Sequence, residues 1–152
     1  MAIKHRCPIQ NQHINNVVSV KGDAYKAFTT YKDDGQANIG TNVISGTFWK
    51  SAGIKVIHDK PFYIIGVDTM LPQSSTTLSN IVVVNYLSDY GVLAYDLNGH
   101  SIRNSNLKFK GGSEWKTTDT LINIPKIGWC YKVATNVFIP AKYQQGSGFK
   151  YD

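Results

Sequence analysis

The fold of this chain is decided by a stretch that occurs twice. It reads Phe62-Tyr63-Ile64-Ile65-Gly66-Val67-Asp68-Thr69-Met70-Leu71-Pro72 in the first half and Cys130-Tyr131-Lys132-Val133-Ala134-Thr135-Asn136-Val137-Phe138-Ile139-Pro140 in the second. Both copies are rich in β-branched and aromatic residues and end at a proline, a pattern typical of strands. The tyrosine and the proline each return after 68 residues (131 minus 63 and 140 minus 72).

Two earlier segments repeat in the same order. Gly35 returns as Gly99, an offset of 64 (99 minus 35), and Trp49-Lys50 returns as Trp115-Lys116, an offset of 66 (115 minus 49). A slowly growing offset is what one small insertion per loop produces. The sequence therefore predicts two tandem modules within its 152 residues. Modules this small bury little core each, so we expect them to pack on one another.

Composition sets the expected boundaries. Residues 17–73 form the first module, residues 81–145 form the second, and the polar, uncharged run 74–80 is expected to be a linker. Residues 1–16 and 146–152 are expected to be terminal tails.

Short runs of Val, Ile, Thr and Tyr between turn residues indicate an all-β fold. We expect two barrel-like or sandwich-like modules, with a short helical turn near each module end, the second near residues 139–144. Strands are predicted over residues 25–31, 39–44, 48–57 and 62–67, and then over 81–84, 91–95, 102–109, 114–124 and 129–134. Asn98-Gly99 predicts a hairpin turn with positive φ at both residues, with Asp34-Gly35 as its counterpart.

The chain carries a net charge of +6, from 16 Lys and Arg against 10 Asp and Glu. Residues 1–76 and residues 77–152 each hold eight basic and five acidic side chains, so the basic character belongs to the repeated unit. Such a charge favours an anionic partner, although many basic proteins bind no polyanion. Nucleic acid is disfavoured because only Arg6 and Arg103 supply arginine. No apolar run approaches the length of a transmembrane segment.

The two cysteines, Cys7 and Cys130, are not at equivalent positions of the repeat. Neither has a second ligand at close spacing, so no metal site is expected. They are either two unrelated thiols or, in an extracellular protein, a bridge between the N-terminal segment and the second module. Lys4, His5 and Arg6 are not followed by the apolar run of a signal peptide, so an exported protein would be a fragment of a longer parent.

No catalytic motif is present in the sequence. The four histidines share no spacing, and Gly111-Gly112 lacks the Lys-Ser/Thr of a phosphate loop. Glu114, the sole glutamate, has the apolar Phe48 as its equivalent in the first module. We therefore expect a protein that is not an enzyme and uses no cofactor.

Each Trp-Lys dipeptide places a large apolar side chain beside a cation. Adjacent side chains of a strand face opposite sides, so one of each pair faces inward. We expect Trp49 and Trp115 to face the core, because small modules need their largest apolar residues there, and Lys50 and Lys116 to be exposed. Dispersed lysines suit a flexible repeating polyanion, since many weak contacts add up along a polymer.

The second copy resembles a known family. The run from Trp129 to Tyr143, preceded by Tyr95-Asp96-Leu97-Asn98-Gly99 and Gly112-Ser113-Glu114-Trp115-Lys116, is similar to the surface layer protein (SLAP) domain of lactic acid bacteria. The resemblance covers residues 17–145 as two copies, and the first copy departs from it, with Ile64 at the position of Lys132. It implies non-catalytic tandem modules that hold S-layer or exported proteins on the anionic wall polymers of Gram-positive bacteria.

The hypothesis from these observations is a secreted cell-wall-binding module, located at the cell surface. Its expected partner is teichoic acid, lipoteichoic acid or a peptidoglycan-associated glycan, bound in a lysine-lined groove near the junction of the modules. The candidate ligand-binding residues are Lys50, Lys110, Lys116, Lys132, Lys142, Tyr31, Tyr95 and Tyr143. The alternatives are a self-assembly or partner-docking module of a surface layer, or the targeting domain of an exported bacteriocin-like or lytic protein.

Overall fold

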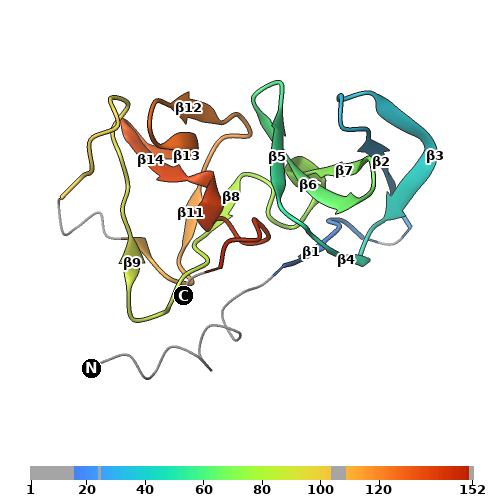
Figure 1. The fold of residues 1–152 in the computed structure, drawn as a ribbon. Helices are drawn as coiled ribbons and strands as arrows, with labels where there is room; N and C mark the ends of the chain where they lie inside the picture. The colour runs from blue at the N-terminus through green and yellow to red at the C-terminus, as the bar shows by residue number, and fades with distance from the viewer. Residues whose placement is uncertain (1–15, 24, 104–108, 151–152) are drawn as a thin grey trace.

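The computed structural model describes residues 16–23, 25–103 and 109–150. These residues form an all-β protein of antiparallel sheets, none of which closes into a barrel. The first and second halves of the chain form two groups of strands that lie side by side (Figure 1). We call residues 17–77 module one and residues 81–145 module two.

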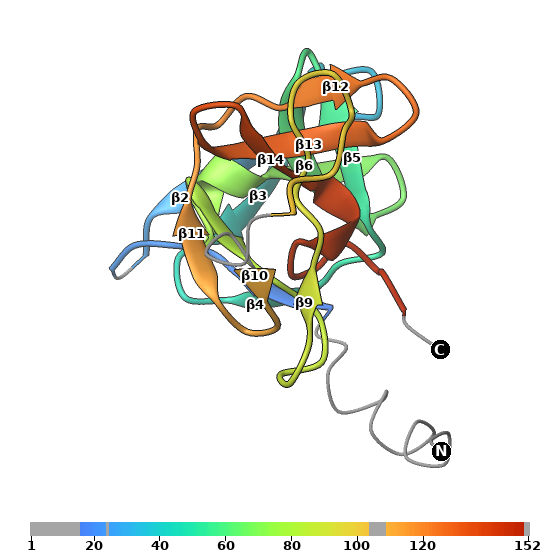
Figure 2. The same ribbon diagram turned by 90° about the vertical axis from the view of Figure 1, so that its left-hand side faces the viewer.

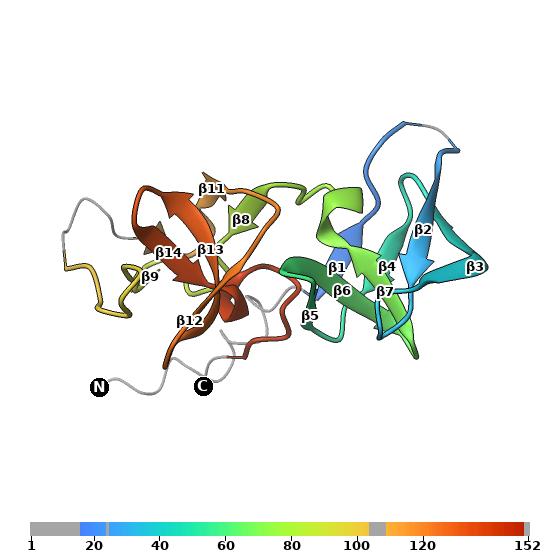
Figure 3. The same ribbon diagram turned by 90° about the horizontal axis from the view of Figure 1, so that it is seen from above.

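Module one contains a five-stranded sheet and a separate two-stranded one. Its elements are β1 (Val17–Ser19), β2 (Ala27–Tyr31), β3 (Ala37–Ile44), β4 (Phe48–Lys50), β5 (Ile54–Ile57), β6 (Lys60–Gly66), β7 (Thr69–Pro72) and the 3-10 turn η1 (Gln73–Ser75). The large sheet has the order β3-β2-β7-β6-β5, and β1 pairs with β4 (Figure 3).

Module two repeats this arrangement. Its elements are β8 (Ile81–Val83), β9 (Gly91–Val92), β10 (Phe109–Lys110), β11 (Glu114–Lys116), β12 (Ile122–Ile124), β13 (Gly128–Ala134), β14 (Val137–Pro140) and η3 (Ala141–Tyr143). The segment that follows β9 bridges to β14 through Tyr95 and Phe138, at the position where Tyr31 pairs with Met70 in module one. Figure 2 shows β9 and β10 below the sheet β12-β13-β14. Strand order is therefore the same in both modules.

The expected helical turns are confirmed by η1 and η3, which follow Pro72 and Pro140 at equivalent positions. The predicted strand 48–57 is two strands, β4 and β5, and the predicted strand 114–124 is likewise β11 and β12. Strands β7 and β14 were not predicted. They follow tight turns at Asp68 and Asn136, which take φ angles of 49° and 54°.

The hairpin prediction at Asn98-Gly99 was wrong in its backbone angles. Only the glycines have positive φ, 84° at Gly99 and 92° at Gly35. The side chain of Asp96 explains the geometry, because its Oδ1 accepts hydrogen bonds from the backbone N–H groups of Asn98 (3.0 Å) and His100 (2.9 Å). The carboxylate thus binds two backbone N–H groups of the turn. With these bonds in place, a single residue with positive φ is sufficient to reverse the chain.

A slowly growing offset between the copies has a visible source at one hairpin. The turn between β5 and β6 has two residues, His58 and Asp59, both with positive φ. Its counterpart between β12 and β13 has three residues, 125–127. One inserted residue therefore shifts all later positions by one.

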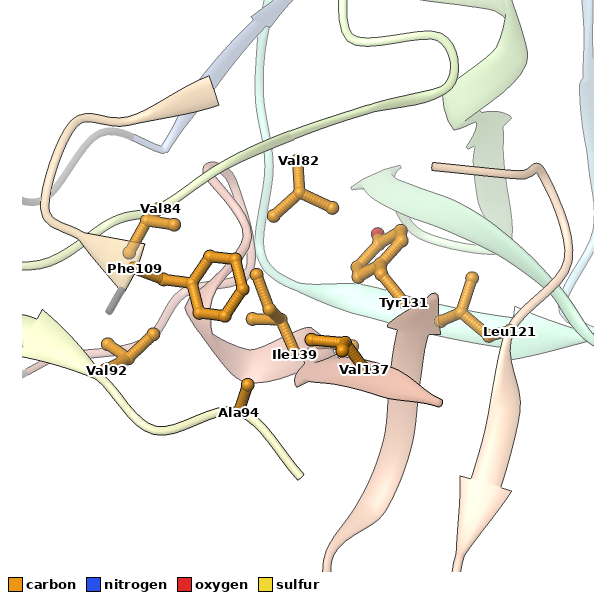
Figure 4. Close-up of a cluster of buried hydrophobic side chains, with 10 residues drawn as sticks. Val82, Val84, Val92, Ala94, Phe109, Leu121, Tyr131, Val137 and Ile139 are labelled. Atoms are coloured by element: carbon orange, nitrogen blue, oxygen red, sulfur yellow. The ribbon is translucent and has the colours of Figure 1, made fainter. Parts of the chain in front are cut away.

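Each module has two clusters of buried hydrophobic side chains, and the largest of the four lies in module two. Figure 4 shows this cluster. Trp115 packs edge to face on Phe109, with 4.5 Å between ring centroids. In module one the equivalent of Phe109 is the smaller Val43, and Trp49 remains 36% exposed. Trp115 faces the core as expected, whereas Trp49 stays partly exposed. The reason is that Val43 has a smaller apolar surface than Phe109 for a tryptophan ring to pack against.

The modules meet through buried polar side chains. The Tyr131 hydroxyl donates to Oε1 of Gln73 at 2.5 Å, and the Tyr63 hydroxyl donates to the carbonyl of Gln145 at 3.0 Å. Both tyrosines are fully buried, and burial raises the pKa of each hydroxyl. Val56 of module one packs on the module-two core. Such satisfied buried bonds fix one relative orientation of the modules.

The expected linker and C-terminal tail are not separate segments, because both contain residues that are buried against module one. Thr76, inside the expected linker, is fully buried and bridges to Val20. Gly146 is also buried, and its carbonyl accepts a 2.7 Å hydrogen bond from the Ser51 hydroxyl. The expected N-terminal tail lies, except for Asn16, outside the described residues.

We predict that Tyr131→Phe lowers the free energy of unfolding by about 1–3 kcal/mol, because Oε1 of Gln73 would stay buried without its donor. Urea denaturation measures this change. Tyr25→Phe, at a ring that is 89% exposed, is the matched control. Equal midpoints for the two variants would show that the bond contributes nothing.

Candidate functional site

The strands that carry the Trp-Lys dipeptides orient the lysines outward. Trp49 pairs with the buried Val18 across β4 and β1, and Trp115 pairs with the buried Val82 across β11 and β8. The next residue of each strand, Lys50 or Lys116, is exposed. The expected exposure of both lysines is confirmed.

An open depression of about 780 Å³ lies on module one, beside Lys50. We call it the module-one face, and it is lined by Asp33, Lys50, Ser51, Ala52, Lys55, Ile64, Ile65, Gly66, Val67, Asp68 and Met70. Its charged side chains are two lysines and two aspartates. The module-one face is therefore electrically balanced.

A repeated hydrogen bond places one of those aspartates. In module one the backbone N–H of Asp33 donates to Oδ1 of Asp68 at 2.6 Å, and in module two the N–H of Leu97 donates to Oδ1 of Asn136 at 2.8 Å. Asp and Asn both tolerate the positive φ that this turn requires. The two modules thus keep the same bond while one acceptor is charged and the other is neutral.

The equivalent surface of module two has two exposed lysines, and the exposed Glu114 lies on the same side of β11 as the first of them. We call this surface the module-two face, and it carries the exposed side chains of Lys116 and Lys132. The hydroxyl of Thr117 donates to the carbonyl of Lys132 at 2.8 Å, which ties the end of β11 to the middle of β13. Leu97 and Asn136 stand where the module-one face has its two aspartates. Both lysines therefore lack the carboxylates found at the matching positions of module one.

A second depression, of about 270 Å³, lies between the modules and is called the junction groove. It is lined by Ile54, Val56, Ile127, Trp129, Pro140, Ala141, Lys142 and Ser147. Module one supplies only aliphatic side chains to it, and module two supplies one aromatic ring and one lysine. A groove at the junction was predicted, but of the five candidate lysines only Lys142 lines it.

The candidate tyrosines are partly used in packing. Tyr31 meets Phe62 edge to face at 5.6 Å, and Tyr95 is half-buried at the bridge to β14. Tyr143 is half-buried against Tyr86, and burial raises its pKa. Each ring therefore has only part of its surface left for a ligand.

The eight candidate residues do not form one site. Lys50 lies on the module-one face, Lys116 and Lys132 on the module-two face and Lys142 in the junction groove, while Lys110 is exposed on β10. Sequence reasoning omitted Trp129 and Asn136. Aligning the two copies places Asn136 opposite Asp68, and this exchange of a charged for a neutral residue could have identified Asn136 from the sequence.

The described segments contain no group of three or more His, Cys, Asp or Glu side chains that could hold a metal ion. The thiol of Cys130 is free and buried in β13, and burial raises its pKa to about 11, so it stays protonated. Cys7 lies outside the described residues. In the same part of the chain, no helix has the length and apolar character needed to cross a membrane.

Comparison with known proteins adds no relative: no family model matches the chain, and no curated protein matches it.

We predict that Asn136→Ala destabilises the protein by about 1–3 kcal/mol, because the N–H of Leu97 loses its acceptor and alanine disfavours positive φ. Asn136→Asp keeps both features and should change the free energy of unfolding by less than about 0.5 kcal/mol. Urea denaturation compares the two variants. Equal losses would mean that the acceptor oxygen has no structural role.

Proposed function

We propose that this protein is a non-catalytic module that attaches an exported or surface-layer protein to an anionic wall polymer such as teichoic or lipoteichoic acid, with the module-two face as its main contact. The observation that carries the proposal is the charge difference between two equivalent faces. The same turn is closed by Asp68 in module one and by Asn136 in module two. The module-two face can therefore meet phosphate groups without a carboxylate at that position.

A polymer suits this surface better than a small anion does. Lys116 and Lys132 are exposed, so water screens each contact and a single phosphate gains little. A chain of phosphates adds many such contacts at once. The remaining exposed lysines extend the attraction along the polymer, and the partner could equally be a glycan that carries the same anionic groups. Such a partner places the protein outside the cell, at the wall.

The experiment is titration of the protein with purified lipoteichoic acid by calorimetry. Replacing Lys116 and Lys132 together by alanine should weaken binding about tenfold at low salt, since each exposed charge contact contributes up to about 1 kcal/mol. Lys26→Ala with Lys32→Ala removes the same charge from module one and is the matched control. Equal weakening by both pairs would assign the binding to net charge, and unchanged binding would exclude the module-two face.

A charge exchange at the turn tests the same face without touching a lysine. Asp68→Asn should strengthen binding of lipoteichoic acid and Asn136→Asp should weaken it, each by about two- to fivefold, because one charge changes while the hydrogen bond stays. Calorimetry at low salt measures both variants. Effects of the same sign in both would contradict the assignment.

A second candidate function is self-assembly of a surface layer, and one observation favours it. Val17 and Phe48 share the outward side of the β1–β4 pair, at 40% and 72% exposure. An apolar patch of this kind is typical of a contact between proteins. Sedimentation that finds a monomer at high protein concentration would exclude this candidate.

A further inference from the structure

The junction groove contains a tryptophan that differs from the other two. The indole N–H groups of Trp49 and Trp115 donate to the hydroxyls of Thr47 and Ser113, at 2.9 and 2.8 Å. Trp129 is half-buried on β13, and its N–H has no hydrogen-bond partner among the residues that the structure describes. Trp129 therefore supplies an aromatic ring to the groove lining, and its N–H donor is not used within the described residues.

The cation at the rim of the groove is held in place by aromatic rings. The Nζ atom of Lys142 lies 5.1 Å from the ring centroid of Tyr143 and 5.6 Å from that of Phe149. Cation–π contacts of this length restrict the ammonium group while leaving its N–H donors available. The groove thus has a positioned donor beside the half-buried ring of Trp129.

Module one has a corner equivalent to the Trp129 and Lys142 side of the groove, and that corner is nearly filled. Only the module-two corner is therefore open. In module one Pro61 and Ser74 replace Trp129 and Lys142, and only about 30 Å³ remains. The ion pair between Lys60 and Asp119, at 2.9 Å, lies at this corner, and the hydrogen bond from Lys60 lowers the pKa of Asp119. That space admits water but no ring-sized ligand.

We infer that the junction groove binds a single neutral sugar ring. Its volume of about 270 Å³ is near the lower end of ligand pockets, which suits one ring. The C–H face of a pyranose packs on an aromatic ring, and its hydroxyls accept hydrogen bonds from the Trp129 N–H and the Lys142 ammonium. The aliphatic wall of Ile54 and Val56 disfavours a phosphate, because one lysine cannot repay its dehydration.

The groove deepens the proposed function, because a wall polymer that carries sugars would engage the module-two face and the groove together. Only the origin of the sugar rests on that proposal. Binding of the ring itself follows from the groove and does not depend on the lysines of the module-two face.

The test is titration of the full chain with glucose, galactose and N-acetylglucosamine, followed by NMR shifts of the indole and backbone N–H groups. Measurement at about 1 M salt, where the screening length is about 3 Å, removes most of the charge attraction. We expect shifts at Trp129, Lys142 and Val56. Binding should weaken at least about tenfold in Trp129→Ala, which loses both the ring and the N–H donor. It should weaken less in Trp129→Phe, which keeps a ring and loses only the donor, and it should also weaken in the exposed Lys142→Ala.

Trp49→Ala is the control, because this tryptophan lies outside the groove lining. The inference would be overturned if none of the three sugars caused a shift, or if the shifts lay away from the groove. It would also be overturned if Trp129→Ala bound the sugar as tightly as the original protein does. The paired alanine variant of Lys116 and Lys132 separates the two proposals. Sugar binding that persists in this variant while lipoteichoic acid binding weakens supports both proposals. Sugar binding without any polymer binding by the original protein refutes only the proposed function.

Discussion

The hydrogen bond between the buried Tyr131 hydroxyl and Gln73 is the contact on which the arrangement of the modules depends. Gln73 also donates through Nε2 to the carbonyl of Ile81, which accepts a second bond from Gln144. A polar chain of this kind has few alternative satisfied arrangements, so the modules are held in one orientation. The junction groove exists only because of that orientation, since Ile54 and Val56 form one wall and Trp129 and Lys142 form the other.

The two modules share the same backbone arrangement but differ in the side chains at equivalent positions. The turn that joins β6 to β7 and the turn that joins β13 to β14 keep the same hydrogen bond, yet Asp68 carries a charge that Asn136 lacks. The corners after Pro72 and Pro140 show the same divergence, because one is closed beside an ion pair and the other is open. Both differences are the basis on which we propose ligand contact at module two, and both leave the fold intact.

Order and spacing in the sequence predicted the duplication, the all-β class and the outward lysines, because these depend on local alternation and on turns. The split of residues 48–57 into two strands and the exposure of Trp49 could not be predicted in this way. They depend on which side chain faces the strand across the core, Val43 in one module and Phe109 in the other. The separate locations of Lys50, Lys132 and Lys142 likewise follow from how the modules pack, which no local pattern encodes.

If an anionic wall polymer is the partner, the protein should bind bacterial wall sacculi through their teichoic acids. The protein should sediment with intact sacculi at low salt, be released as salt increases, and fail to bind sacculi from which teichoic acids have been chemically removed. Binding that survives both treatments would contradict the account and would point to peptidoglycan or to protein assembly.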